Sequence, residues 1–163
     1  MVGNWEVGGI IIWHTGNAVT PTIGFQDPSG TSGAGGLFAS ERPDCTAAPH
    51  YLKQKNNTPG AGFIQWWNTS TFTLPATNTF GTCSSGVLRG PRYSDLDLSL
   101  HKDFLITETK RLEFRSEFIN VFNHPILNFG GGIGAFQLGS STFGHIDSSQ
   151  GERNIQLALK FYF

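Results

Sequence analysis

The residues best suited to metal chemistry in this chain lie too far apart to form a recognised motif. Its five histidines have neither an HExxH nor an i,i+4 arrangement, and its two cysteines are not a CxxC pair. The histidines are His14, His50, His101, His124 and His145. Histidines with this spacing are expected in turns and on polar strand faces. The sequence predicts no metal site.

The serine- and glycine-rich segments do not match the motifs of catalytic loops. Ser84-Ser85-Gly86 and Ser140-Ser141 lack the Gly-x-Ser-x-Gly pattern of a nucleophile elbow. The glycine-rich run 130–134 is not followed by the Lys-Ser/Thr pair of a phosphate-binding loop. Glu113 and Glu117 would need an enclosing pocket to act as acid and base. We therefore expect no enzymatic activity and no cofactor.

Cys45 and Cys83 lie in one long segment between two expected strands. In exported proteins a pair of cysteines forms a disulfide more often than it stays reduced. The sequence does not give the distance between them. A Cys45–Cys83 disulfide and two free thiols therefore both stay open.

Trp66, Trp67 and Phe72 form an aromatic cluster in the same segment. Exposed aromatic rings could stack against sugars or peptides. The alternative is that these rings pack the segment against a barrel rim or join an aromatic girdle. We favour packing.

The elements that position these residues are four segments with period-two alternation, the pattern of strands with one apolar face. They are residues 4–14, 93–104, 110–122 and 153–163. In the last, Ile155, Leu157, Leu159, Phe161 and Phe163 alternate with polar or small residues. About ten alternating residues can cross a bilayer when the strand is tilted. The residues expected on the polar, lumen-facing side of the second and third strands are Asp95, Asp97, His101, Glu113, Arg115 and Glu117.

The composition agrees with a membrane β-protein. Of the 163 residues, 14% are charged, against about 25% in soluble domains. No apolar run reaches the roughly 18 residues that a transmembrane helix needs. The net charge of −1 gives no electrostatic reason to expect a nucleic-acid partner.

The N-terminal residues 1–6 lack the basic and apolar regions of a signal peptide. An outer-membrane protein needs an export signal, so we expect the chain to be the tail of a longer protein.

The connections between the strands are long, short and long. Residues 15–92 and 123–151 are rich in turn residues, and a turn of a few residues near Thr107 joins the middle strands. Outer-membrane barrels alternate long extracellular loops with short periplasmic turns. This predicts that the Thr107 turn and Phe163 are periplasmic and that both long loops are extracellular.

The final strand resembles the C-terminal strand of bacterial outer-membrane β-barrels. The assembly signal of that family has a polar residue, a small residue and two aromatic residues at alternating positions. Gln156, Ala158, Phe161 and Phe163 fit it, with Ala158 where glycine is usual.

Five further segments, in this order and spacing, resemble the C-terminal part of Oar-like TonB-dependent receptors. They are residues 88–91, 95–102, 112–117, 120–125 and 143–146. The resemblance implies an all-β fold, a transmembrane antiparallel barrel of about 22 strands, of which residues 1–163 hold the last four. It also implies that the parent protein lies in the bacterial outer membrane and passes a large nutrient or assists protein export.

The same resemblance implies the partners. They are outer-membrane lipid, the barrel-assembly machinery, the rest of the parent barrel and its plug. TonB would be contacted only through the N-terminal part of the parent, which this chain lacks together with the plug domain.

The competing hypothesis is a soluble all-β binding module with long recognition loops. In such a module the Leu and Phe faces of the strands would meet in a core. In a barrel they would form one outward lipid belt.

The hairpin of residues 93–122 has a register that parity and charge predict. Apolar residues are even-numbered on both strands, so paired residue numbers must sum to an even value. A turn centred on Thr107 would place Asp103 opposite Arg111 and His101 opposite Glu113. A turn centred on Glu108 would instead oppose Asp103 and Glu113, two like charges. We therefore predict the Thr107-centred turn.

Overall fold

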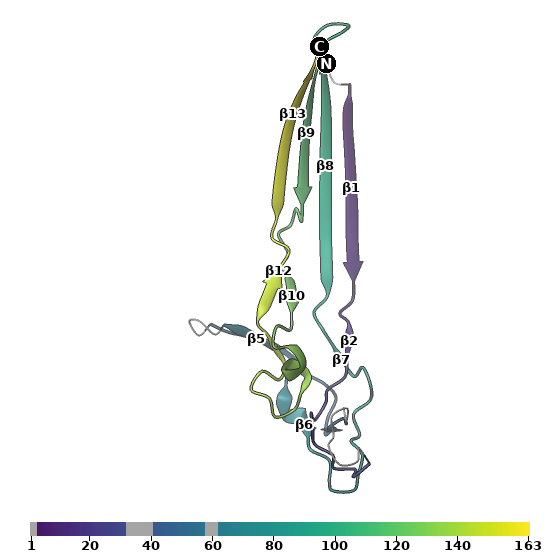
Figure 1. The fold of residues 1–163 in the computed structure, drawn as a ribbon, viewed down its shortest axis with the longest axis vertical. Helices are drawn as coiled ribbons and strands as arrows, with labels where there is room; N and C mark the ends of the chain where they lie inside the picture. Colours follow the sequence, from purple (N-terminus) through teal and green to yellow (C-terminus); the bar gives the residue numbers. More distant parts are fainter. Residues whose placement is uncertain (1–2, 32–40, 58–61) are drawn as a thin grey trace. The chain divides into compact units, whose positions relative to one another are not determined.

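The computed structural model describes residues 3–31, 41–57 and 62–163, and the chain forms two compact units (Figure 1). We call the first the sheet unit; it comprises Met1–Thr15, Arg92–Ile126 and Gln150–Phe163. We call the second the loop unit; it comprises Gly16–Pro91 and Leu127–Ser149. Within the described ranges, no helix is long and apolar enough to cross a membrane.

The sheet unit is a four-stranded antiparallel sheet in the order β1-β8-β9-β13 (Figure 1). The strands are β1 (Trp5–His14), β8 (Tyr93–Leu105), β9 (Arg111–Ile119) and β13 (Asn154–Tyr162). Three of them fall inside the alternating segments of the sequence, and β8 extends one residue beyond its segment, to Leu105. The chain is therefore all-β and antiparallel here, as the alternation predicts.

The third strand is shorter than the sequence suggested. It ends at Ile119, three residues before the expected end at residue 122. Asn120 and Asn123 have φ values of 52° and 51°, in the left-handed region that interrupts a strand. Asparagine adopts this conformation more readily than other non-glycine residues, so the backbone turns at these two positions.

The apolar residues of all four strands share one face of the sheet. Val7 pairs with Leu100, Leu100 with Ser116, and Ser116 with Leu157. Every β8–β9 pair joins two even or two odd residues, so the parity prediction for this hairpin is confirmed. The exceptions are Ile10 and Ile12, whose partners Asp97 and Asp95 place them on the polar face, and Leu105 and Ile119, whose partners are Arg111 and Asn154.

The charge prediction for the hairpin register was wrong. The structure pairs Asp103 with Glu113 and His101 with Arg115, which centres the turn on Glu108. Two features offset the like-charge pair: Arg111 lies 4.0 Å diagonally from Asp103, and Lys160 is the β13 partner of Glu113.

Backbone hydrogen bonds at both ends of the hairpin fix this register. At the turn, the N–H groups of Ile106 and Thr107 donate to the carbonyl of Lys110 at 2.9 and 3.1 Å. The Lys110 N–H donates to the Thr107 hydroxyl at 3.1 Å. At the other end, the Val121 N–H donates to the Leu96 carbonyl at 2.9 Å.

The loop unit contains short elements rather than unstructured connections. Its chain segments hold β2 (Ala18–Val19), β3 (Asp44–Cys45), β4 (Tyr51–Asn56), β5 (Phe63–Trp67), η1 (Thr69–Thr71), β6 (Phe72–Thr73), β7 (Leu88–Arg89), η2 (Gly132–Phe136) and β11 (His145–Ile146). At its border, β10 (Ile126–Asn128) pairs with β12 (Ser148–Gln150). The largest sheet has the order β11-β5-β4 and joins the two long segments.

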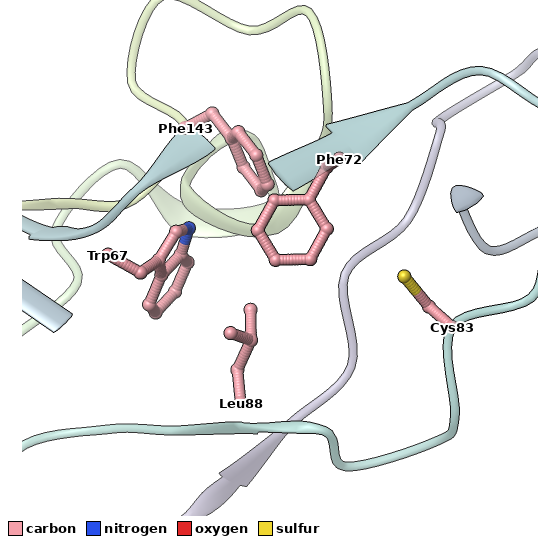
Figure 2. Packing of buried hydrophobic residues seen from close by; sticks show 5 residues of the cluster. All are labelled: Trp67, Phe72, Cys83, Leu88 and Phe143. Atoms are coloured by element: carbon pink, nitrogen blue, oxygen red, sulfur yellow. The ribbon is translucent and has the colours of Figure 1, made fainter. Parts of the chain in front are cut away.

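The loop unit has its own hydrophobic core (Figure 2). Trp67 is fully buried and packs edge-on against Phe143, at 6.0 Å between ring centroids, and Phe72 packs edge-on against the same ring at 5.5 Å. Leu88 closes the cluster. The buried hydrophobic side chains of the described residues all lie in this unit: Ile23, Trp67, Phe72, Cys83, Leu88, Ala135, Phe143 and Ile146.

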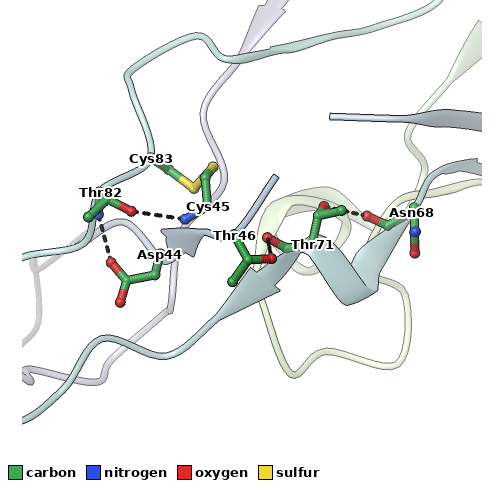
Figure 3. The surroundings of a disulfide bond; sticks show 7 residues. All are labelled: Asp44, Cys45, Thr46, Asn68, Thr71, Thr82 and Cys83. Carbon is green, nitrogen blue, oxygen red and sulfur yellow. Dashed lines mark hydrogen bonds between the residues drawn. A yellow bond between two sulfur atoms is a disulfide. The ribbon is translucent and has the colours of Figure 1, made fainter. Parts of the chain in front are cut away.

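A disulfide joins Cys45 and Cys83 across 38 residues, the alternative of the two that the sequence left open (Figure 3). Around it, the Cys45 N–H donates to the Thr82 hydroxyl at 3.1 Å, and the Thr82 N–H donates to Asp44 at 2.9 Å. A Cβ at Gly81 would lie 1.8 Å from the carbonyl oxygen of Arg42, so only glycine fits beside the bridge. The disulfide therefore links two chain segments, around Arg42 and around Gly81, whose backbones lie in direct contact.

Candidate functional site

The apolar face of the sheet is open to its surroundings. Val7 is 71% exposed and Leu157 is 67% exposed, although both lie inside hydrogen-bonded strands. The other large apolar side chains of this face that are at least 40% exposed are Trp5, Ile11, Trp13, Phe104, Ile155, Leu159 and Phe161. A soluble monomer rarely exposes such a contiguous apolar surface. We call these residues, with Leu96, Leu98, Leu100, Leu112, Phe114 and Phe118, the apolar belt.

The height of the apolar belt suits a lipid bilayer. On β8 it runs from Ser94, the partner of Trp13, to Phe104. Ten residues of strand span about 33 Å. At a tilt of about 40°, this is close to the roughly 25 Å apolar band of outer-membrane barrels.

Lys102 is the one charged residue on the paired apolar faces of the four strands. Only 5% of its surface is exposed, because its ammonium group lies 4.8 Å from the Trp5 ring centroid and 5.6 Å from that of Phe104. It also donates a hydrogen bond to the Gly3 carbonyl. The alternation of residue types gave no sign of this arrangement, although the even number of Lys102 places it on the apolar face. An aromatic-flanked lysine is typical of a membrane interface.

The opposite face of the sheet is charged. The cross-strand pairs place on it all six residues predicted to be polar-facing: Asp95, Asp97, His101, Glu113, Arg115 and Glu117. Arg115 lies 3.2 Å from Glu117, and the Tyr162 hydroxyl donates to Glu113 at 2.8 Å. Asp95 accepts a hydrogen bond from the Tyr93 hydroxyl at 2.9 Å. Along β9, opposite charges alternate on this face, from Arg111 through Glu113 and Arg115 to Glu117.

Asn120, directly after β9, bonds to Asp97 of β8 and to the connecting segments at His124 and Gly151, a role that the alternation of residue types did not reveal. Its N–H donates to Asp97 at 2.9 Å, and its side-chain oxygen accepts from the His124 N–H at 3.0 Å. Its side-chain amide donates to the carbonyls of His124 and Gly151. Its side chain is 4% exposed, so these bonds are shielded from water. The sequence feature that could have indicated this role is the position of Asn120 at the start of segment 120–125, which resembles a segment of Oar-like receptors.

The four residues of the expected assembly signal divide between the two faces of β13. Gln156 and Ala158 pair with Glu117 and Arg115 on the charged face, whereas Phe161 pairs with Leu112 in the apolar belt. Phe163 follows the last strand residue and is 94% exposed. Its ring stacks with that of Phe161 at 6.1 Å between centroids. The two rings form one exposed aromatic pair.

The aromatic cluster of the loop unit is mainly structural. Trp67 and Phe72 are buried in the core, so they cannot stack against a ligand. Trp66 is half-buried, and its indole N–H donates to the Arg89 carbonyl at 2.8 Å.

The histidines do not gather into a site. Among the described residues, no three His, Cys, Asp or Glu side chains lie close enough to hold a metal ion. His145 stacks on Phe63 at 3.6 Å between centroids. Burial lowers the pKa of His145, and the nearby charge of Asp147 partly opposes this shift.

Comparison with known proteins agrees with this geometry. Residues 1–156 match a family model described as an outer membrane beta barrel domain. No curated protein and no solved structure gives a significant match. The chain therefore belongs to the outer membrane beta barrel domain family, and its place is the bacterial outer membrane.

Proposed function

We propose that the chain is the C-terminal part of an Oar-like TonB-dependent receptor. In this role it supplies four closing strands, the assembly signal of the barrel and a folded extracellular unit. The role is not catalytic. The intact receptor would pass a large nutrient or assist protein export.

The observation that carries the proposal is the exposed apolar belt together with the charged face behind it. A barrel with a water-filled lumen needs strands that are apolar outside and polar inside, over the thickness of the bilayer. The sheet has this division along most of its length, with Ile10 and Ile12 of β1 as the main departures. The charged face would line the lumen and the apolar belt would contact outer-membrane lipid.

The segments that resemble Oar-like receptors occupy structural junctions, which supports the narrower assignment. Segment 120–125 begins with Asn120, which bonds to β8 at Asp97 and to the connecting segments at His124 and Gly151. In segment 143–146, Phe143 and Ile146 are buried, and Gly144 has a φ of 77°. A Cβ at Gly144 would lie 2.8 Å from the indole nitrogen of Trp67. These segments therefore hold residue types that the fold requires.

The proposed orientation follows from the connections. The tight turn centred on Glu108 and the exposed Phe163 would face the periplasm, where the barrel-assembly machinery would meet the C-terminal aromatic pair. The long segments of the loop unit would face the cell exterior. The remaining barrel strands and the plug would come from the rest of the parent protein, as would the contact with TonB.

A soluble all-β binding module is the weaker alternative. It requires the Leu and Phe faces to meet in a core. In the described part of the sheet unit these side chains share one exposed face, and the buried hydrophobic residues lie in the loop unit.

The receptor assignment is tested by the size and location of the native protein. Antibodies against this chain should detect, in outer-membrane fractions, a heat-modifiable protein much larger than the 17.8 kDa of the chain. Its mass spectrum should contain peptides of a plug domain. A 17.8 kDa species in the soluble fraction would refute the proposal.

The lipid contact is tested separately by fluorescence quenching in vesicles of brominated lipid. Variants of the full chain that keep only Trp5 or only Trp13 should be quenched strongly. A variant that keeps only Trp67, which lies in the loop-unit core, should be quenched weakly. Equal quenching of all three would argue against the apolar belt as the lipid-facing surface.

A further inference from the structure

Two aromatic side chains of the loop unit are held by the backbone of one residue. The Trp66 indole N–H donates to the Arg89 carbonyl at 2.8 Å, and the Arg89 N–H donates to the Tyr51 hydroxyl at 2.8 Å. β7 pairs with β2 along one edge only. On its other edge, these two bonds satisfy both the N–H and the carbonyl group of Arg89. The rings themselves meet edge to face at 6.3 Å. Both are half-buried, so part of each ring stays accessible.

Lys53 brings a positive charge to this pair. It lies where the register of β4 and β5 shifts between Tyr51 and Gln54, and its φ is 51°. Its ammonium group lies 5.5 Å from the centroid of the Trp66 ring. A left-handed backbone is unfavourable for lysine, and such strain is concentrated at functional sites. The bulge redirects a side chain that a regular strand would place elsewhere.

The charge at this surface has no counter-ion within the described residues. The two ion pairs of that part of the chain involve neither Lys53 nor Arg89. The hairpin strands β4 and β5 contain Lys53 and Lys55 but no acidic residue. Lys53 and Arg89 are both exposed. The surface is therefore aromatic and cationic.

We propose that Tyr51, Trp66 and Lys53 form a binding site for an acidic saccharide. The carboxylate of a uronic acid unit would pair with the Lys53 ammonium group, and the less polar face of the sugar ring would pack against the aromatic pair. Charge-assisted hydrogen bonds supply the selectivity for the acid, and amphipathic aromatic rings supply contact area. The inference uses contacts within the loop unit alone, so it goes beyond the receptor assignment and does not depend on it.

The site is preorganised, which favours binding. The Tyr51 and Trp66 rings are each fixed by a hydrogen bond to Arg89 and by contact with the other ring. Little side-chain freedom is then lost when a ligand binds. The strain at Lys53 is already present in the free protein.

The test is calorimetric titration of the full chain in detergent micelles at low ionic strength. The probes are polygalacturonate and its methyl ester, which share a backbone and differ in charge. We expect binding of polygalacturonate and affinity at least about tenfold weaker for the ester, as one charge-assisted hydrogen bond implies.

The variants separate the site from general charge. Lys53→Asn removes the ammonium group with a residue that tolerates a left-handed backbone, and should weaken binding about tenfold. Lys55→Asn removes the same charge two residues away and should change affinity less than twofold. Retained thermal stability of both variants shows that they fold. Equal losses in the two variants, equal affinity for acid and ester, or no binding of polygalacturonate would each overturn the proposal.

Discussion

Replacing Leu157 by arginine tests the apolar belt most directly. Leu157 is 67% exposed, and its row across the sheet contains Ser116, Leu100 and Val7. Along β8, the row of Leu157 lies two cross-strand rows from that of Phe104 at one end of the apolar belt. It lies three rows from that of Trp13 at the other end. The position is thus near the middle of the bilayer.

The neighbouring residue provides a matched control. Gln156 pairs with Glu117 on the charged face, one residue away on the same strand. An arginine at the bilayer midplane costs about 2–4 kcal/mol, whereas one on the lumen side costs little. Leu157→Arg should therefore reduce stable insertion by about 30-fold to 900-fold. Gln156→Arg should stay within about 1 kcal/mol of the parent, because the new charge lies opposite a carboxylate.

The assay is refolding of the full chain from urea into phospholipid vesicles, followed by flotation and by the β-sheet circular dichroism signal. The apparent free energy of membrane insertion is compared for the parent chain and the two variants. Similar losses for Leu157→Arg and Gln156→Arg would refute the division into a lipid face and a lumen face.

Three further predictions concern other parts of the chain. Deleting Phe163 should lower the amount of parent barrel in the outer membrane more than replacing any loop residue does, as quantified by immunoblot; normal amounts would contradict its role in assembly. Replacing Cys45 and Cys83 by alanine should destabilise the loop unit by about 4 kcal/mol, since the bridge spans 38 residues; unchanged resistance to denaturant would exclude this. The lowered pKa of His145 means that the unfolded chain binds a proton more tightly, so loop-unit stability should be complete above the ordinary histidine pKa and fall as the pH drops through it. His145→Gln should remove this pH dependence, and a parent chain whose stability does not change with pH would contradict it.

The sheet unit could be predicted from the sequence because its signal is local. Alternation in each strand reports directly which residues share a face, and each of the four segments contains one long strand. The residues expected on the polar face do lie together. What a period of two cannot show is a break such as Asn120. There the backbone N–H donates to the Asp97 side chain, and the Asn120 side chain accepts from the His124 N–H, in place of regular strand pairing. It also does not distinguish Lys102 from its apolar neighbours, since its charge is accommodated by Trp5 and Phe104.

The loop unit could not be predicted, because it depends on contacts between distant segments. Trp67 and Phe72 meet Phe143, which lies more than 70 residues away in the chain. Composition shows only that these segments are rich in turn residues. Their aromatic content was the usable signal, since rings of this size are stable in a small unit only when they are buried together.

The hairpin register shows why a pairwise charge rule was too weak to decide the structure. Opposing Asp103 and Glu113 is unfavourable when only those two residues are considered. In the sheet, however, Glu113 also accepts a hydrogen bond from Tyr162 and lies opposite Lys160, while Arg111 approaches Asp103. Pairs of charges on exposed faces contribute about 1 kcal/mol or less. Backbone bonds at Lys110 and Val121, together with the bond from the Asn120 N–H to the Asp97 side chain, act on the same register and outweigh one such pair. The turn and the strand break therefore set the register, and the charges adapt to it.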